Sequence, residues 1–202
     1  MADRDLMARR DSGDQCPGMT PRPPLSCDRI VDAAVRYVDH DCLDGLSMRR
    51  LGAELGVEAM SLYRYFPSKA ALLGAVICRM LADVALPGPE AGVIWEDAVH
   101  AYARSFRAVC VTHPRLLPLL ATMGPGNPTL ASIEGRMTAF WREAGFDASV
   151  AAQAQAALQG YVTGACLHGC PGTDQAEGAF ELGLDALVSG LRLRLAGAAA
   201  PA

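Results

Sequence analysis

The sequence has 202 residues, a formal net charge of −4 at pH 7 and 51% apolar residues. Such a chain can bury a substantial core, either as one domain or as a small head with a larger body. Glycine and alanine are frequent and runs of β-branched residues are scarce, which favours packed helices over sheets. The acidic balance argues against a protein that coats nucleic acid without sequence preference, so any DNA binding must come from a local patch.

The cysteines and the hydropathy of the chain predict the cellular compartment of the protein. The seven cysteines are odd in number and widely scattered, which is not the pattern of a disulfide framework. The N-terminus lacks the continuous apolar run of a signal peptide, and no uncharged apolar stretch is long enough to span a bilayer. We therefore expect a cytoplasmic protein with no membrane partner.

The start of the chain predicts an arm followed by a helix. Residues 1–25 are charged and then rich in proline and glycine, without apolar periodicity, which predicts a disordered arm. From Ser26 to His40 apolar residues recur at helical spacing, which predicts a first helix that backs the next segment. Residues 41–46 form the predicted connection.

A helix-turn-helix is predicted directly after this connection. Ser47 is a suitable N-cap, and Leu51 and Leu55 fall one turn apart on one helical face. Gly56 supplies a residue that tolerates positive φ, and a short second helix is expected over 58–65. This second helix turns hydroxyls, an arginine and aromatic rings outward, which suits the phosphates and base edges of DNA. The alternative is an ordinary corner between two helices of a helical domain.

The segment from about Ile30 to Ile77 closely resembles the DNA-binding head of the TetR (tetracycline-repressor) family of transcriptional regulators. Its central part reads L-S-M-R-R-L-G-A-E-L-G-V-E-A-M-S-L-Y-R-Y-F-P-S-K-A-A-L-L, within which L-G-V…L-Y-x-Y-F-x-S-K is the most specific run. The resemblance implies an all-helical, homodimeric repressor that a small-molecule effector releases from DNA. Two heads on a symmetric dimer imply a palindromic operator with half-sites about one helical turn or more apart.

The resemblance also implies which residues contact DNA. Arg49, near the start of the first motif helix, would read a base, guanine, through a bidentate contact. Residues 59–61 would face base edges or thymine methyls, and two tyrosines with the only lysine of the chain would hold phosphates. Arg64 occupies a variable position of the family and would be either a second base reader or a solvent-exposed arginine. The implied set is Arg49, Ala59, Met60, Ser61, Tyr63, Arg64, Tyr65 and Lys69.

A fourth helix, predicted over 68–84, connects the head to the rest. Its apolar stripe is too wide for a helix that faces the head alone, so its far end should pack on the body. Residues 86–92 (L-P-G-P-E-A-G) form the predicted boundary. The expected domains are a DNA-binding domain with its connecting helix over 26–84 and a ligand-binding and dimerisation domain over 93–197. The fold class is all-α: a three-helix helix-turn-helix head joined by a fourth helix to a larger C-terminal helical bundle.

Within the body, one helix is expected to begin at an N-cap provided by Asn127 or Thr129. The next helix along the chain, over 147–168, is expected to be the longest. Gly160 and Gly164 lie one turn apart on this long helix and would let two backbones approach across a subunit contact. The last helix carries a narrow, coiled-coil-like stripe. Its members are Phe180, Leu184, Leu187, Val188, Leu191 and Leu195.

These two faces predict an isologous four-helix contact between two copies of the chain, unless both stripes are core within one chain. The body also resembles the C-terminal region of tetracycline-repressor-type proteins. The runs that carry this likeness are W-E-D-A, S-F-R-A-V-C-V-T-H-P, I-E-G-R-M and G-Y-V-T-G.

An effector pocket between the body helices would be lined by aromatic, histidine and methionine side chains. The alternative for each is that a bulky residue at helical spacing only fills core. His113 stands where tetracycline repressors place a histidine on a drug-bound metal, but Pro114 follows it, which favours a helix-ending role. The candidates are His100, Tyr102, Phe106, His113, Met137, Trp141 and Tyr161.

An enzyme and a metal- or thiol-sensing regulator are the two alternatives to a ligand-responsive repressor. An enzyme is not expected, because the sequence has no G-x-S-x-G, no phosphate-cradling glycine loop and no paired-histidine zinc motif, and no cofactor is predicted. A metal- or thiol-sensing DNA-binding regulator is the alternative function, since Cys166, His168 and Cys170 bring three soft ligands within five residues. That spacing is not a standard zinc pattern, so no metal site is predicted.

Overall fold

The computed structural model describes residues 24–41, 43–86, 94–123, 128, 130–168 and 173–198. Within these ranges every regular element is a helix and none is a strand, which confirms the predicted all-α fold class. The predicted arm lies outside the described residues except for residues 24 and 25, and the predicted boundary lies outside them except for residue 86. In the described part of the chain no helix combines the length and the apolar character that a bilayer crossing requires.

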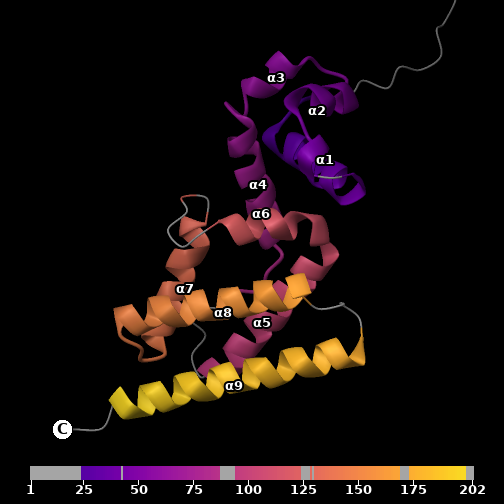
Figure 1. The fold of residues 1–202 in the computed structure, drawn as a ribbon. Helices are drawn as coiled ribbons and strands as arrows, with labels where there is room; N and C mark the ends of the chain where they lie inside the picture. Colours follow the sequence, from indigo (N-terminus) through magenta and orange to yellow (C-terminus); the bar gives the residue numbers. More distant parts are fainter. Residues whose placement is uncertain are drawn as a thin grey trace, which may run out of the picture.

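The head is built from three helices at one end of the molecule (Figure 1). Helix α1 packs against both α2 and α4, so it forms the support on which the motif rests. The apolar side of α1 is buried, with Ile30, Ala33 and Val38 fully inaccessible to solvent. The elements of the head are α1 (Cys27–His40), a 3₁₀ turn η1 (Leu43–Gly45), α2 (Met48–Leu55) and α3 (Ala59–Tyr63).

Helix α4 (Lys69–Leu81) runs from the head to the body (Figure 1). It contacts α1 along its length and α5 in the body. Its buried residues include Leu72 near the head and Leu81 near the body, as the wide apolar stripe predicts. Val84, beyond the end of the helix, is also buried, so the segment after α4 stays attached to the body core.

The body is arranged around α8, which packs against α5, α6, α7 and α9. Figure 1 shows α8 and α9 side by side at the end of the molecule opposite the head. The buried residues of head and body form one continuous hydrophobic cluster. The elements of the body are α5 (Trp95–Thr112), η2 (Pro114–Leu116), α6 (Leu117–Thr122), α7 (Ala131–Glu143), α8 (Ala148–His168) and α9 (Asp174–Ala198).

The structure differs from the sequence-based expectations in three elements. Helix α3 is shorter than 58–65, because Phe66 turns inward to be buried and Pro67 follows it. Helix α7 begins after Leu130, and the two residues expected to cap it, at 127 and 129, lie outside the described residues. The longest helix is α9, with 25 residues against 21 in α8.

The predicted interface stripe on α9 is also divided. Phe180, Leu184 and Val188 are buried within the single chain, so these three are core. The other half of the stripe, at 187, 191 and 195, is only partly buried. Periodicity located the apolar face of α9 correctly but could not say which protein surface covers it.

Candidate nucleic-acid interface and effector cavity

The turn between α2 and α3 is fixed by two glycines. Gly56 ends α2 in the left-handed conformation, with φ of 71°, as the sequence predicts. A Cβ on Gly52 would lie 2.8 Å from the backbone oxygen of Val57, so α2 and the turn approach too closely for any side chain there. At the other end of α2, the Ser47 hydroxyl accepts a hydrogen bond from the Arg50 amide at 3.2 Å. The motif is therefore held by local backbone requirements.

Helix α3 has one buried and one exposed side. Leu62 is fully buried and anchors the helix to the head core. Met60 is 71% exposed and Tyr63 is 44% exposed, although both side chains are largely apolar. Ala59 and Ser61 are half-buried beside them. An exposed methionine and tyrosine on a short helix form a surface suited to contact with another molecule.

The two adjacent arginines of α2 have different surroundings. Arg49 is exposed at the start of the helix. Arg50 instead donates hydrogen bonds from Nη1 to the Tyr37 hydroxyl and to the Gly45 carbonyl, both at 3.2 Å. The Tyr37 hydroxyl also donates to Gly45, so Arg50 and Tyr37 together hold the connection between α1 and α2. Arg50 is a positioning residue that the sequence did not indicate.

The residues after α3 connect this helix to the chain before α1 and to the start of α4. The Tyr65 hydroxyl donates a hydrogen bond of 2.8 Å to the carbonyl of Leu25, which fastens the chain before α1 to the end of α3. Arg64 is exposed. Ser68 caps α4 by accepting from the amide of Ala71 at 3.1 Å, and Lys69 is the first residue of that helix. The candidates at 49, 59–61, 63–65 and 69 thus come from α2, from α3 with the two residues after it, and from the start of α4.

Polar contacts fasten the head to the body. His113 ends α5, and its Nδ1 lies 3.0 Å from a carboxylate oxygen of Asp39 on α1. Arg115 donates to the carbonyl of His40 at 2.6 Å and to that of Asp41. The sequence predicted a helix-ending role for His113, and the structure adds the acidic partner, which is 74 positions away. His113 therefore lies at the junction of head and body and not in the cavity described next.

A small cavity lies beside the body end of α4. Its volume is about 20 Å³, which is room for about one water molecule. Burial raises the pKa of Tyr102, one of its lining residues. The buried side chain of Gln155 donates to the Tyr102 hydroxyl at 3.4 Å and accepts from the indole N–H of Trp141 at 3.1 Å. The lining consists of Leu81, Val84, Tyr102, Phe106, Leu130, Ile133, Glu134, Gln155 and Gln159.

Only two of the seven sequence-predicted pocket residues, Tyr102 and Phe106, line this cavity. Met137 and Trp141 are completely buried, and the Trp141 ring packs edge-on against Phe146 at a centroid distance of 5.4 Å. They belong to the core, as the alternative interpretation proposed. The sequence missed the polar residues Gln155 and Gln159, whose spacing of four on an alanine-rich helix would have been a usable signal.

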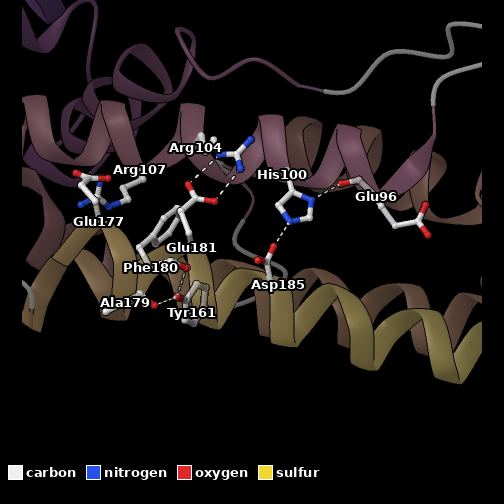
Figure 2. Close-up of polar contacts among 10 residues, drawn as sticks. All are labelled: Glu96, His100, Arg104, Arg107, Tyr161, Glu177, Ala179, Phe180, Glu181 and Asp185. Atoms are coloured by element: carbon white, nitrogen blue, oxygen red, sulfur yellow. Dashed lines mark hydrogen bonds and ion pairs between the residues drawn. The ribbon is translucent and has the colours of Figure 1, made fainter. Parts of the chain in front are cut away.

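The remaining two predicted residues, His100 and Tyr161, lie along the contact of α9 with its neighbours (Figure 2). His100 Nε2 lies 2.9 Å from Asp185, and the Tyr161 hydroxyl donates to the carbonyl of Phe180 at 2.7 Å. Further ion pairs along α5 and α9 are Arg104–Glu181 at 2.7 Å, Arg107–Glu177 at 2.8 Å and Arg192–Glu96 at 2.9 Å. This row of charges joins the exposed sides of α5 and α9.

The close backbone approach predicted at Gly160 and Gly164 was assigned to a contact between two copies of the chain, and it stays a prediction. A Cβ added to either residue would have no described atom within 4 Å. Within the chain, a tight approach occurs at Gly183 of α9, where an added Cβ would overlap the Tyr161 ring. On α9, Leu182 and Leu193 are 73% and 74% exposed. A groove of about 350 Å³ between α8 and α9 is lined mainly by alanine and leucine side chains.

The alternative metal-sensing site receives no support. Cys166 is half-buried on α8, and His168 uses Nδ1 in a 3.0 Å contact with the carbonyl of Gly164. Cys170 lies outside the described residues. Among the residues that are described, no three histidine, cysteine or carboxylate side chains are grouped so as to hold a metal ion.

Both halves of the chain match models of known families. Residues 30–76 match the model described as bacterial regulatory proteins, tetR family, and residues 86–178 match the tetracyclin repressor-like C-terminal domain. The first match covers the motif and its supporting helix, and the second covers most of the body.

Individual relatives agree with these matches. The HTH-type transcriptional repressor DrrR1 of Streptomyces coeruleorubidus is 36% identical over 74% of this chain and 55% of its own length. The tetracycline repressor protein class A from transposon 1721 of Escherichia coli is 31% identical over 71% of this chain and 67% of its own length. The chain thus spans little more than half the length of DrrR1.

A solved structure shares the fold over most of the chain. The TetR family protein ActR of Streptomyces coelicolor, in complex with actinorhodin, superposes with a TM-score of 0.74 at 27% identity, covering 85% of this chain and 99% of that one. Two family models in consecutive order, relatives of this identity and a shared helical fold lead to one conclusion: this chain belongs to the TetR family of bacterial regulatory proteins.

Proposed function

We propose that this protein is a ligand-responsive transcriptional repressor that binds a palindromic operator as a homodimer and leaves it when a small-molecule effector binds. The observation that carries the proposal is the double attachment of α4. Near its start Leu72 is buried in the head, and Leu81 at its end lines the body cavity. A change in the cavity therefore acts directly on the helix that carries the head.

The proposed DNA contacts use the exposed side chains of the head. Arg49 reads a guanine edge, and Ala59, Met60 and Ser61 face base edges, where the Met60 side chain suits a thymine methyl. Tyr63 and Lys69 hold phosphates. Arg64, exposed at the end of α3, is a second base reader.

Tyr65 is assigned differently from the other tyrosine. Its single hydroxyl hydrogen is already donated to the Leu25 carbonyl, so it would have to break that bond to donate to a phosphate. We propose that Tyr65 mainly holds the chain before α1 in position. Its ring, which is 39% exposed, lies at the edge of the DNA-binding surface.

Homodimerisation through α8 and α9 is supported by their outer surfaces. The groove between them is lined mainly by apolar side chains, with Gln153 and Arg194 as its polar members, and two leucines of α9 protrude. Exposed leucines beside an apolar groove gain free energy when a second copy covers them. In a symmetric pair this surface faces itself, which gives the two heads the two-fold relation that a palindrome requires.

Effector binding requires the cavity to open, because about 20 Å³ is far smaller than a drug-sized molecule needs. A ligand that binds only the open form shifts the population toward it. Leu81 and Val84 move with the cavity wall, and α4 then changes the position of the head. The structure of ActR in complex with actinorhodin supports a small-molecule effector, and the Tyr102 and Phe106 rings of this chain suit an aromatic ligand.

Selection of bound duplexes from a random DNA pool tests the proposal. We expect the full chain to enrich a palindrome, and a variant with Met60→Asp, Tyr63→Asp and Lys69→Glu to enrich nothing, because the added charges repel phosphates. These three side chains are exposed or half-buried, so circular dichroism should find the variant folded. Failure of the native chain to enrich any sequence would refute operator binding.

A further inference from the structure

A second and larger cavity lies on the opposite side of α5 from the aromatic core, between α5, α8 and the first half of α9. Its volume is about 300 Å³ and it opens to solvent. The walls are mainly apolar, and the Tyr161 and Phe180 rings stack at a centroid distance of 5.7 Å. The lining consists of Arg107, Val111, Tyr161, Ala165, Cys166, His168, Ala176, Ala179 and Phe180. Tyr161 is the one sequence-predicted pocket residue in this lining, and none of the contacts proposed above for DNA or the effector uses this cavity.

Cys166 is the nucleophilic group of this cavity, and a second thiol supports it. Cys110, on α5, is fully buried, and a hydrogen bond between the two thiols is the largest influence on the pKa of each. This hydrogen bond lowers the pKa of Cys166, partial burial opposes the shift, and the Arg107 guanidinium adds to the lowering. The same bond and its own burial raise the pKa of Cys110, so the proton of the pair stays on the buried sulfur.

The charged and titratable groups that face Cys166 come from all three helices. Arg107 of α5 lies over the Phe180 ring, 4.9 Å from its centroid, and is paired with Glu177 of α9. Tyr161 and His168 are the titratable residues that α8 itself adds to the wall. The Tyr161 hydroxyl donates to the backbone carbonyl of Phe180 at 2.7 Å, which holds its ring in the cavity wall.

We propose that this cavity is a covalent binding site in which Cys166 adds to a small, flat α,β-unsaturated carbonyl compound, such as a quinone or a maleimide. The Cys166 thiolate forms a carbon–sulfur bond at the β-carbon, and the π electrons of the C=C bond move to the carbonyl oxygen. The resulting enolate takes a proton from water at the α-carbon. Nothing leaves and no oxidant is needed, while the aromatic walls hold the planar molecule in contact with the sulfur.

The chain contains its own reference thiols. Cys27 and Cys78 are both exposed, and partial burial raises the pKa of Cys78. If access alone determined the rate, these two cysteines would react before the half-buried Cys166. We expect Cys166 to react first. Its rate should gain roughly threefold for each unit by which its pKa lies below that of the reference thiol, because a lower pKa raises the thiolate fraction more than it reduces the nucleophilicity of the thiolate.

The experiment treats the full-length protein with substoichiometric N-ethylmaleimide and follows each cysteine by peptide mass spectrometry between pH 6 and pH 9. We expect Cys166 to be modified before Cys27 and Cys78, most clearly at low pH. Cys110→Ala should slow the modification of Cys166 and move its pH–rate profile to higher pH. Cys110→Ser retains a hydrogen-bond donor, so it should largely restore the rate and the profile. Rates at Cys27 should not change in either variant.

A third variant separates the cavity from the thiol. Ala176→Leu places a bulky side chain in the cavity wall without touching either sulfur, so it should slow Cys166 while leaving the midpoint of the pH–rate profile in place. Modification of Cys166 no faster than Cys78 would overturn the proposal. An unchanged pH–rate profile in Cys110→Ala, or an unchanged rate in Ala176→Leu, would equally contradict it. None of these readouts depends on DNA binding.

Discussion

The head and the body of this protein hold their functional side chains in different ways. In the head, the turn between α2 and α3 and the helix ends beside it depend on residues between Ser47 and Ser68, through two helix caps and two glycines. In the body, the defining contacts join distant segments, such as Arg192 with Glu96 across 96 positions. The aromatic side chains follow the same division, since Tyr63 of the head is exposed and Trp141 of the body is fully buried. A local pattern can therefore specify a binding surface, whereas a cavity requires the whole fold.

Truncation of Trp141 in the body and of Tyr63 in the head should give the largest difference in the free energy of unfolding. We expect Trp141→Ala to lower the free energy of unfolding by about 3–5 kcal/mol, because it empties the centre of an aromatic cluster and leaves Gln155 without a donor. Tyr63→Ala should change it by less than about 0.5 kcal/mol, because its ring is 44% exposed. Urea unfolding measures both. A small effect of Trp141→Ala would mean that this ring is a pocket wall and not core.

Two glycine substitutions examine the local geometry of the head. Gly52→Ala should cost about 1–3 kcal/mol, since the new Cβ would lie 2.8 Å from a backbone oxygen that cannot rotate away. Gly135→Ala on α7 meets no described atom within 4 Å and should stabilise the protein by about 0.5–1 kcal/mol through helix propensity. Thermal unfolding compares the pair. Equal stability of the two variants would show that the turn is less tightly packed than described.

Loss of single charges distinguishes base reading from phosphate binding. With a selected operator, Arg49→Ala should reduce discrimination against a mismatched base by about 1–3 kcal/mol. Lys69→Ala should weaken binding to all duplexes and reduce the salt slope by about one unit. Arg142→Ala, which removes an exposed charge from α7, is the control and should leave binding unchanged. Gel-shift titrations in which the two head variants behave like this control would remove the assigned roles.

The smallest expected effect comes from the ion pairs along α9. Glu181 accepts from Arg104, and this hydrogen bond lowers the pKa of the carboxyl below its ordinary value of 4.5, against partial burial, which raises it. A lowered folded-state pKa adds stability above the unfolded pKa, and this is lost as pH falls through the folded value. Because both side chains are more than one-third exposed, Glu181→Gln should cost only about 0.2–1 kcal/mol at pH 7.

The measurement is thermal unfolding of the native protein and the variant at pH 7 and again well below pH 4.5, where the difference should disappear. Glu143→Gln is the control, since Glu143 forms no ion pair with any described residue. A difference that persists in acid would show that Glu181 acts through its shape and not through its charge.

The same division explains how much could be predicted from the sequence. The all-α fold and the caps at Ser47 and Gly56 were predictable because each depends on a few neighbouring residues. The partner of His113 was not, because Asp39 reaches it only through the tertiary packing of α1 on the body. Stripes on α8 and α9 gave the apolar faces but not what covers them, so half of the α9 stripe proved to be core.

The candidate sites show the same limit. Arg49 and the exposed side of α3 followed from the motif and its resemblance, and their roles on DNA stay predictions. In the body, bulky residues were chosen as pocket candidates, yet Trp141 and Met137 fill core while Gln155 and Gln159 line the cavity. A side chain's size does not reveal whether it faces a cavity or a neighbour, since both positions have the same helical spacing.

The central claim, that two heads on a symmetric dimer bind two half-sites, is tested most directly by the stoichiometry of the DNA complex. Sedimentation velocity at separate wavelengths for protein and a labelled selected duplex measures the ratio of the two in one species. We expect two protomers per palindromic duplex, with no stable complex of one protomer. A protein that remains a monomer and binds the duplex one to one would contradict it.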